Sequence, residues 1–209
     1  FPKPQTSNPP LPVSIVKTAR TVREVTEKMD VSQSLLVMGY RTGLDFMGQH
    51  KYEYAVMNSV LGGGVSSLLF KNVREKMSLC YFCASTIDRL KGVMLVYSGI
   101  SAENTSSAIS DMRRRVFCSM PLATVKEQIE ALRQGKISDG DIEAAKADLI
   151  NQYNQVGDSP AALDSYYFSG FFSGDMSSPE ERTENILKVT GKDISSAANR
   201  LSQDTVYFL

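Results

Sequence analysis

Histidine is scarce in this chain: His50 is the only one among 209 residues, and this scarcity restricts the chemistry the chain can perform. A catalytic zinc site takes three protein ligands, commonly with histidine among them. A serine or cysteine nucleophile needs a neighbouring base, and the sequence offers neither a G-x-S-x-G motif nor a second histidine. We therefore expect the chain to bind no metal or other cofactor and to perform no nucleophilic catalysis.

Cysteine is also sparse, with Cys80, Cys83 and Cys118 as the only three. This number is too small and too odd for a disulfide framework, and it favours a reducing, cytoplasmic setting. Cys80 and Cys83 form a C-x-x-C motif on a predicted strand. Because side chains alternate along a strand, we expect these two thiols on opposite faces, unable to share a metal.

The chain has no charge surplus and no long apolar run. Lysine plus arginine and aspartate plus glutamate each number 23. No basic excess therefore suggests nucleic acid or an anionic membrane surface as a partner. No stretch approaches the ~18 apolar residues of a membrane-spanning helix. Since the chain begins with Phe1 and shows no signal peptide, we expect it to belong to a longer or processed polypeptide.

The order of predicted elements indicates one domain after a linker. The first twelve residues contain five prolines, so we predict a linker and lead-in segment over residues 1–22 and a single domain over 23–209. Apolar patterns predict strands near 22–29, 34–40, 79–87, 93–100 and 205–209. Helical spacing and capping residues predict helices near 45–61, 68–77, 101–118, 124–134, 142–155, 159–172, 178–189 and 193–201. This order favours an α+β fold, a two-layer sandwich of a mainly antiparallel sheet against helices.

Two local motifs resemble functional sites only superficially. The segment from His50 to Tyr54 matches half of an H-x-x-E-H zinc helix, but tyrosine replaces the second histidine. We expect His50 at the surface near a helix start. Gly62, Gly63 and Gly64 lack the pattern of a phosphate-binding loop. We expect them to form a tight junction that needs positive φ, with Ser66 or Ser67 capping the next helix.

Arg74 and Tyr81 are the candidate binding residues. A guanidinium can hold a peptide carbonyl or a carboxylate with two donors. A phenol can donate to an oxygen that gains negative charge during a reaction. The alternative is that Arg74 pairs with surface acids such as Glu75 and that Tyr81 only packs.

The run from Leu61 to Tyr81 reads LGGGVSSLLFKNVREKMSLCY. It resembles the LGGG-SSRLF-VREK-GLAY segment in the second, non-zinc domain of the M16 zinc peptidases, the family of pitrilysin, insulinase and the mitochondrial processing peptidase. The segments Met38–Thr42, Gly135–Ser138 and Ile142–Lys146 also resemble this family. The first of these is most similar to bacterial M16-like proteins that lack the zinc motif.

The resemblance implies a non-catalytic domain with the fold of the processing-peptidase metallohydrolases, forming part of a peptide-binding clamshell. In active members an arginine and a tyrosine of the second domain face the zinc across the clamshell, and Arg74 and Tyr81 stand at those positions. It further implies zinc only in another M16 domain of the same protein or of a partner, an unfolded peptide as substrate, and a dimer. A catalytically silent scaffold, or a module that offers a sheet edge to peptides, is the alternative.

The sequence departs from the family pattern in three places. Ser78-Leu79-Cys80-Tyr81 replaces the usual Gly-Leu-Ala-Tyr, and Leu68 stands where arginine is common. The segment from Arg113 to Pro121 interrupts a predicted helix that would otherwise run to about residue 134. Because proline disrupts a helix interior, we expect a kink or a looped insertion there.

Overall fold

The computed structural model describes residues 15–27, 29, 33–44, 49–75, 80–101 and 111–209. Most of the predicted linker, the first residues of the first predicted helix and the turn before Tyr81 therefore lie outside the described residues. Five strands are described: β1 (Arg23–Thr26), β2 (Gln33–Arg41), β3 (Cys80–Asp88), β4 (Val93–Ser101) and β5 (Ser202–Phe208). The helical elements are α1 (Lys51–Gly62), the π-helical η1 (Phe70–Glu75), α2 (Asp111–Arg133), α3 (Asp139–Asn154), the short 3₁₀ turn η3 (Gln155–Asp158), α4 (Pro160–Ser173), α5 (Pro179–Lys188) and α6 (Gly191–Asn199).

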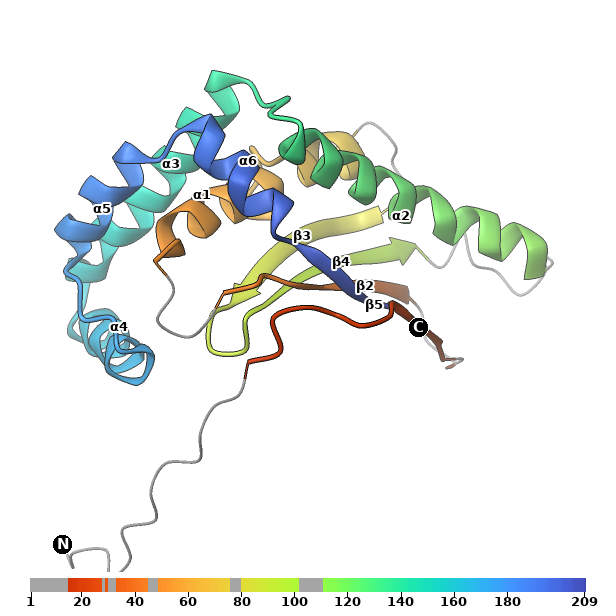
Figure 1. Ribbon diagram of the computed structural model, residues 1–209, viewed down its shortest axis with the longest axis horizontal. Helices are drawn as coiled ribbons and strands as arrows, with labels where there is room; N and C mark the ends of the chain where they lie inside the picture. The colour runs from red at the N-terminus through yellow and green to blue at the C-terminus, as the bar shows by residue number, and fades with distance from the viewer. Residues whose placement is uncertain (1–14, 28, 30–32, 45–48, 76–79, 102–110) are drawn as a thin grey trace, which may run out of the picture.

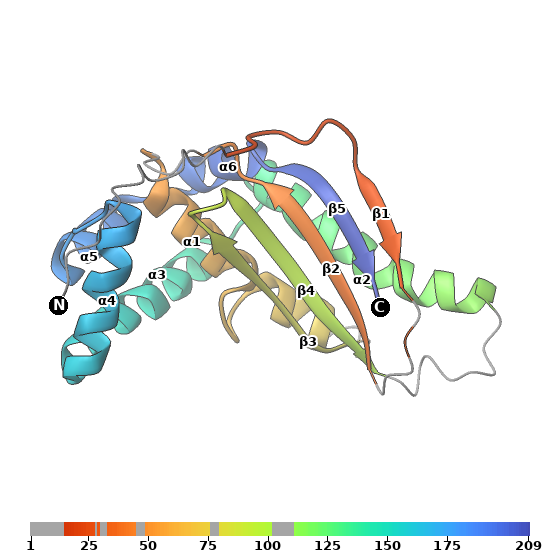
Figure 2. The ribbon, with the colours of Figure 1, turned by 90° about the horizontal axis from the view of Figure 1, so that it is seen from below.

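The strands form one sheet in the order β1-β5-β2-β4-β3. All neighbours are antiparallel except β1 and β5, which are parallel. Figure 2 shows the five strands side by side, with β3 and β1 at the two edges. The predicted α+β class with a mainly antiparallel sheet is confirmed.

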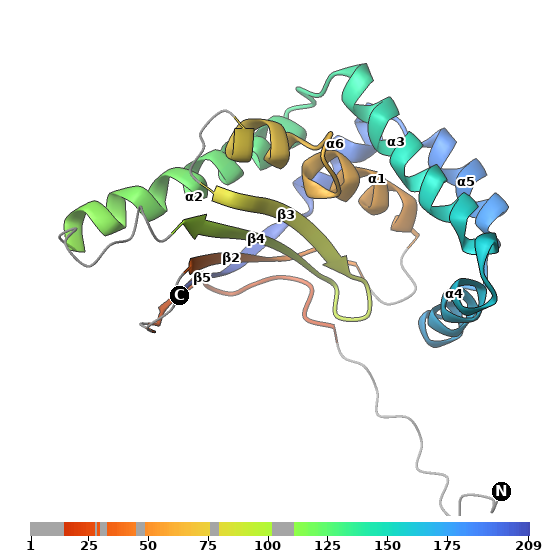
Figure 3. The same cartoon turned by 180° about the vertical axis from the view of Figure 1, so that it is seen from behind.

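Helices cover one face of the sheet, while in the described part of the chain the opposite face carries none (Figures 1 and 3). The covered face is apolar because alternate strand residues point into it, such as Leu36 and Met38 of β2 and Met94 and Val96 of β4. The helices bury matching side chains against them, among them Met57 of α1. The helix α4 lies beyond the end of this sandwich (Figure 1). None of the described helices is long and apolar enough to cross a membrane.

Polar caps fix where the C-terminal helices begin. The side chain of Ser138 accepts a hydrogen bond from the Asp141 backbone N–H at the start of α3. Ser159 and Ser178 do the same at α4 and α5, each followed by proline in the first helical turn. The structure confirms these three helix starts. Serine is disfavoured inside a helix because its side chain competes for backbone hydrogen bonds, but at a helix start it satisfies a free N–H group.

Of the two alternatives predicted at Pro121, a kink or a looped insertion, the looped insertion is wrong. The helix α2 runs without interruption from Asp111 to Arg133 and contains Pro121 in its interior. Pro121, Val125, Ile129 and Leu132 are all buried and recur at helical spacing. Continuous burial of this stripe against the rest of the core outweighs the local cost of the proline.

The expected positive φ of the three glycines is also wrong, and two of them, Gly62 and Gly63, are required instead for close packing. None of them is among the glycines with positive φ. A Cβ on Gly62 would lie 2.5 Å from the backbone nitrogen of Ser85 in β3. A Cβ on Gly63 would lie 2.7 Å from the Cα of Ser59. The glycine at position 62 therefore lets α1 rest directly on the backbone of β3. As predicted, a serine caps the next turn, because the Phe70 N–H donates to the Ser67 hydroxyl.

Candidate functional site

A β-bulge at the beginning of β3 displays Tyr81. Cys80 pairs with Ile100 and Phe82 pairs with Gly99, so Tyr81 is the extra residue on its strand. Its side chain is 76% exposed, the largest exposure among the exposed large hydrophobic side chains of the described residues. The phenol is thus presented to solvent at the sheet edge and does not pack in the core.

Arg74 is displayed from the adjoining π-helical segment η1. Val73 is fully buried and anchors this segment to the core, whereas Arg74 is exposed. The guanidinium lies over the Phe70 ring, with its carbon 4.5 Å from the ring centroid. A cation over an aromatic face is oriented while its N–H groups stay available for a ligand. Because η1 packs on β3, Arg74 and Tyr81 come from contacting elements; we name them the Arg74–Tyr81 site.

The same bulge corrects our prediction for Cys80 and Cys83. Both are buried free thiols, and the bulge places them on the same, covered face of the sheet. The Cys83 thiol donates to Cys80, which lowers the pKa of Cys80 to about 7 despite burial, and the charge of Arg74 acts in the same direction. The hydrogen bond and burial together raise the pKa of Cys83.

The described residues do not bring together three histidine, cysteine or acidic side chains that could hold a metal. His50 precedes the first turn of α1 as predicted, with its Nδ1 3.2 Å from the Glu53 carboxylate. Tyr54, the residue in place of the second histidine of the motif, is buried and donates its hydroxyl hydrogen to the Thr42 carbonyl. This donor set does not suit zinc.

An ion cluster at the opposite end of β3 was missed by the sequence analysis. Asp175 accepts a hydrogen bond from Lys51 of α1 at 2.7 Å. Arg182 of α5 and Arg89 of the β3–β4 turn approach its other oxygen at 3.2 and 3.8 Å. Although burial opposes ionisation, the hydrogen bonds from Lys51 and Ser177 and the charge of Arg182 lower the pKa of Asp175 to about 2. The residues of this cluster are far apart in the sequence, so no local sequence pattern predicts it.

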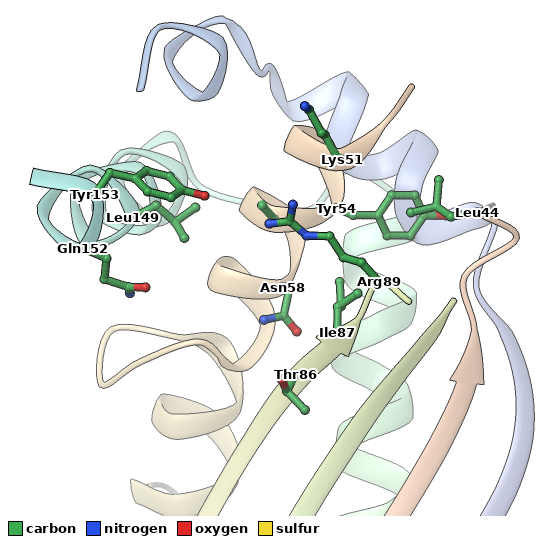
Figure 4. Close-up of a pocket in the computed structure, with 11 residues that line it drawn as sticks. Leu44, Lys51, Tyr54, Asn58, Thr86, Ile87, Arg89, Leu149, Gln152 and Tyr153 are labelled. Atoms are coloured by element: carbon green, nitrogen blue, oxygen red, sulfur yellow. The ribbon is translucent and has the colours of Figure 1, made fainter. Parts of the chain in front are cut away.

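A pocket of about 210 Å³ adjoins this cluster, between α1, α3 and the end of β3 (Figure 4). The guanidinium of Arg89 extends into the middle of the view, and the amide groups of Asn58 and Gln152 and the hydroxyl of Tyr153 lie around it. The Asn58 Oδ1 is buried without a hydrogen-bond partner among the described residues. The pocket therefore has a mixed lining, in which the polar groups and the cation of Arg89 lie among apolar side chains such as Leu44, Ile87 and Leu149.

Comparison with known proteins shows the family to which this chain belongs. The family model described as the Peptidase M16 inactive domain matches residues 1–149. This chain is an M16 inactive domain. A probable inactive metalloprotease of Bacillus subtilis, YmfF, is 34% identical over 187 residues, which are 90% of this chain and 41% of that protein. An uncharacterized zinc protease of Rickettsia bellii is 25% identical over 82% of this chain and 39% of its own length.

Solved structures share this fold. A conserved protein from Enterococcus faecalis has a TM-score of 0.78 and 30% identity, with 92% of this chain and 42% of that chain covered. The M16 inactive domain from Pseudomonas fluorescens shares the fold, with a TM-score of 0.68 at 16% identity over 91% of this chain and 43% of its own. The chain thus spans about two fifths of each of these four relatives. It is a non-catalytic M16 domain, and those relatives include proteins described as zinc proteases.

Proposed function

We propose that this M16 domain forms one wall of a peptide-binding clamshell, in which Arg74 and Tyr81 hold the backbone of an unfolded peptide against a zinc-bearing M16 half. The observation that carries the proposal is the bulge that exposes Tyr81 on β3, the strand against which η1 packs while displaying the exposed Arg74. An exposed arginine and phenol at one sheet edge can together hold a carbonyl and stabilise its developing negative charge. Zinc would be supplied by the other half, in the same protein or in a partner, and we infer a dimeric arrangement of such halves.

The uncovered face of the sheet supports a binding role. Among its side chains are the half-buried Val37, the exposed Leu95 and the contacting pair Phe82 and Tyr97, whose ring centroids are 6.0 Å apart. An apolar sheet face that no helix covers is typical of a surface that meets a partner or ligand. We take residues 23–209 as the domain that builds this face and residues 1–22 as the linker that leads into it.

Simple strand addition to β3 is less well supported. The Asn58 side chain donates to the Ser85 carbonyl at 3.4 Å, and Gly62 packs against the Ser85 backbone nitrogen. The helix α1 therefore occupies the middle of the β3 edge, where an added strand would have to pair. We further infer a bacterial and cytoplasmic setting, supported by the bacterial relatives and by the free thiols of Cys80 and Cys83.

The test is substitution of Arg74→Ala and Tyr81→Phe in the assembly that contains the zinc-bearing half, with hydrolysis of an unfolded peptide as the readout. Removing a donor to a developing oxyanion lowers kcat by about a hundredfold or more, so we expect a loss of that size for Tyr81→Phe. Arg23→Ala at the far sheet edge and Tyr167→Phe on α4 are matched controls, and both should leave the rate unchanged.

A specific observation also favours a catalytically silent scaffold, since the relative YmfF is described as probably inactive. That function predicts that Arg74→Ala and Tyr81→Phe leave every activity of the assembly unchanged, provided that circular dichroism shows intact folding. The same outcome would overturn the clamshell proposal.

A further inference from the structure

A second groove, which Arg89 also lines, lies between α4 and the β3–β4 turn. Its volume is about 600 Å³. We name it the α4 groove, and its lining contains the apolar side chains of Leu90, Ala162 and Phe168, the hydroxyl groups of Ser165, Tyr166, Ser169 and Ser173, and the guanidinium groups of Arg89 and Arg182. No acidic side chain is among these lining residues.

The charges around the α4 groove are not balanced. Three cations of the ion cluster, Lys51, Arg89 and Arg182, share the single carboxylate of Asp175. Lys51 approaches it most closely, at 2.7 Å, whereas the Arg89 guanidinium is 3.8 Å away, beyond hydrogen-bond distance. Within the described part of the chain this is the one ion pair that Arg89 makes, so its donors are available for another anion.

Arg182, which also lines the α4 groove, has a buried hydrogen-bond donor without a partner among the described residues. Its side chain is only 9% exposed, and it stacks beside Tyr166 with its guanidinium carbon 4.6 Å from the ring centroid. Its Nη2 donates to the Asp175 carbonyl at 3.0 Å, but its Nε is buried without a hydrogen-bond partner among the described residues. A buried, unpaired donor on an arginine is costly and favours an additional acceptor.

Apolar side chains lie next to these cations. Leu90 is 43% exposed and Phe168 is 63% exposed, from the turn and from α4 respectively. The turn that carries Arg89 and Leu90 is held in place by the Lys91 N–H, which donates to Asp88, and by the left-handed conformation of Gly92. A fixed cation beside an exposed apolar surface is suited to a ligand that places a negative charge next to a hydrocarbon group.

We propose that the α4 groove binds the free C-terminal carboxylate of a peptide that ends in an apolar residue. Arg89 holds the carboxylate, Leu90 and Phe168 contact the last side chain, and the serine hydroxyls meet the peptide backbone. This site is separate from the Arg74–Tyr81 site and lies at the opposite end of β3, so it does not depend on that site making transition-state contacts.

The test measures binding of a short fluorescein-labelled peptide that ends in leucine to the intact protein, by fluorescence anisotropy. We expect the free acid to bind about tenfold or more tightly than the same peptide with a C-terminal amide, as for loss of one charge-assisted hydrogen bond. Arg89→Gln should remove this preference. Lys91→Gln, which changes the same charge in the same turn at a side chain 78% exposed, should preserve it.

Further variants separate the parts of the proposal. Leu90→Ser should weaken the acid and the amide alike, because it removes apolar contact and leaves the charge in place. Arg74→Ala and Tyr81→Phe should leave the preference for the acid unchanged, so failure of one site is distinguishable from failure of the other. Equal affinity for acid and amide, an unaltered preference in Arg89→Gln, or full displacement of the peptide by inorganic phosphate at a concentration equal to that of the peptide would overturn the proposal.

Discussion

Substitution of Gly62→Ala tests whether α1 rests directly on the backbone of β3. The added Cβ would lie 2.5 Å from the Ser85 nitrogen, 2.7 Å from the Ser85 hydroxyl and 2.8 Å from a methyl group of Leu69. Ser85 is held in the sheet by its pairing with Val96, so its backbone cannot move without disturbing β4. The clash therefore has to be relieved by displacing the helix from the strand.

The size of the effect follows from two opposing contributions. Overpacking a core usually costs about 1–3 kcal/mol, and the upper end applies here because two of the three close contacts involve Ser85, one of them its backbone. Replacing glycine by alanine inside a helix returns up to about 1 kcal/mol of helix propensity. We therefore expect the free energy of unfolding to fall by about 2 kcal/mol or more, which lowers the urea midpoint by about 1 M.

The assay is urea unfolding followed by circular dichroism, with Gly157→Ala as the matched control. Gly157 lies in η3, and a Cβ there would meet nothing within 4 Å. The control should change the free energy of unfolding by no more than about 0.5 kcal/mol. If Gly62→Ala were as stable as the unsubstituted protein while the control behaved as expected, the direct approach of α1 to β3 would be refuted.

Two further predictions concern other parts of the fold. The depressed pKa of Asp175 means that its contribution to stability is complete above about pH 4 and is lost as pH falls towards 2. Asp175→Asn should therefore lower the urea midpoint at pH 7. The midpoint of the variant should also decrease less between pH 4 and pH 2 than that of the unsubstituted protein, and an equal decrease in both proteins would contradict the ion cluster. Pro121→Ala should raise the free energy of unfolding by about 1–2 kcal/mol, because a helix interior disfavours proline by about 3 kcal/mol and alanine gives up some buried surface. A thermal-unfolding midpoint that does not rise would argue against the continuous helix.

Local sequence signals predicted most elements because they act within a few residues. The serines at positions 138, 159 and 178 each accept a hydrogen bond from a backbone N–H group at the start of their own helix. The alternation of buried and less buried side chains along β2 follows from the two faces of the strand. The looped insertion predicted at Pro121 does not form, because tertiary burial of a stripe shared with Val125 and Ile129 overrides the local rule that proline ends a helix.

The candidate sites depend on a β-bulge and on contacts between distant segments, which sequence periodicity does not predict. A single extra residue at Tyr81 changed which face Cys80 and Cys83 occupy, and a bulge leaves no clear sign in the sequence. The ion cluster joins α1, the β3–β4 turn and α5 through Asp175, across long separations in the chain. Arg74 and Tyr81 were proposed through resemblance to M16 domains, and their role stays a prediction.

The most direct test of the central claim is hydrolysis of an unfolded peptide by a zinc-bearing M16 half, measured with and without this domain. We predict that this domain alone cleaves nothing in metal-replete buffer and that the zinc-bearing half becomes fully active only when the domain is present. Cleavage by this domain alone, or a zinc-bearing half whose rate is unchanged by it, would contradict the account.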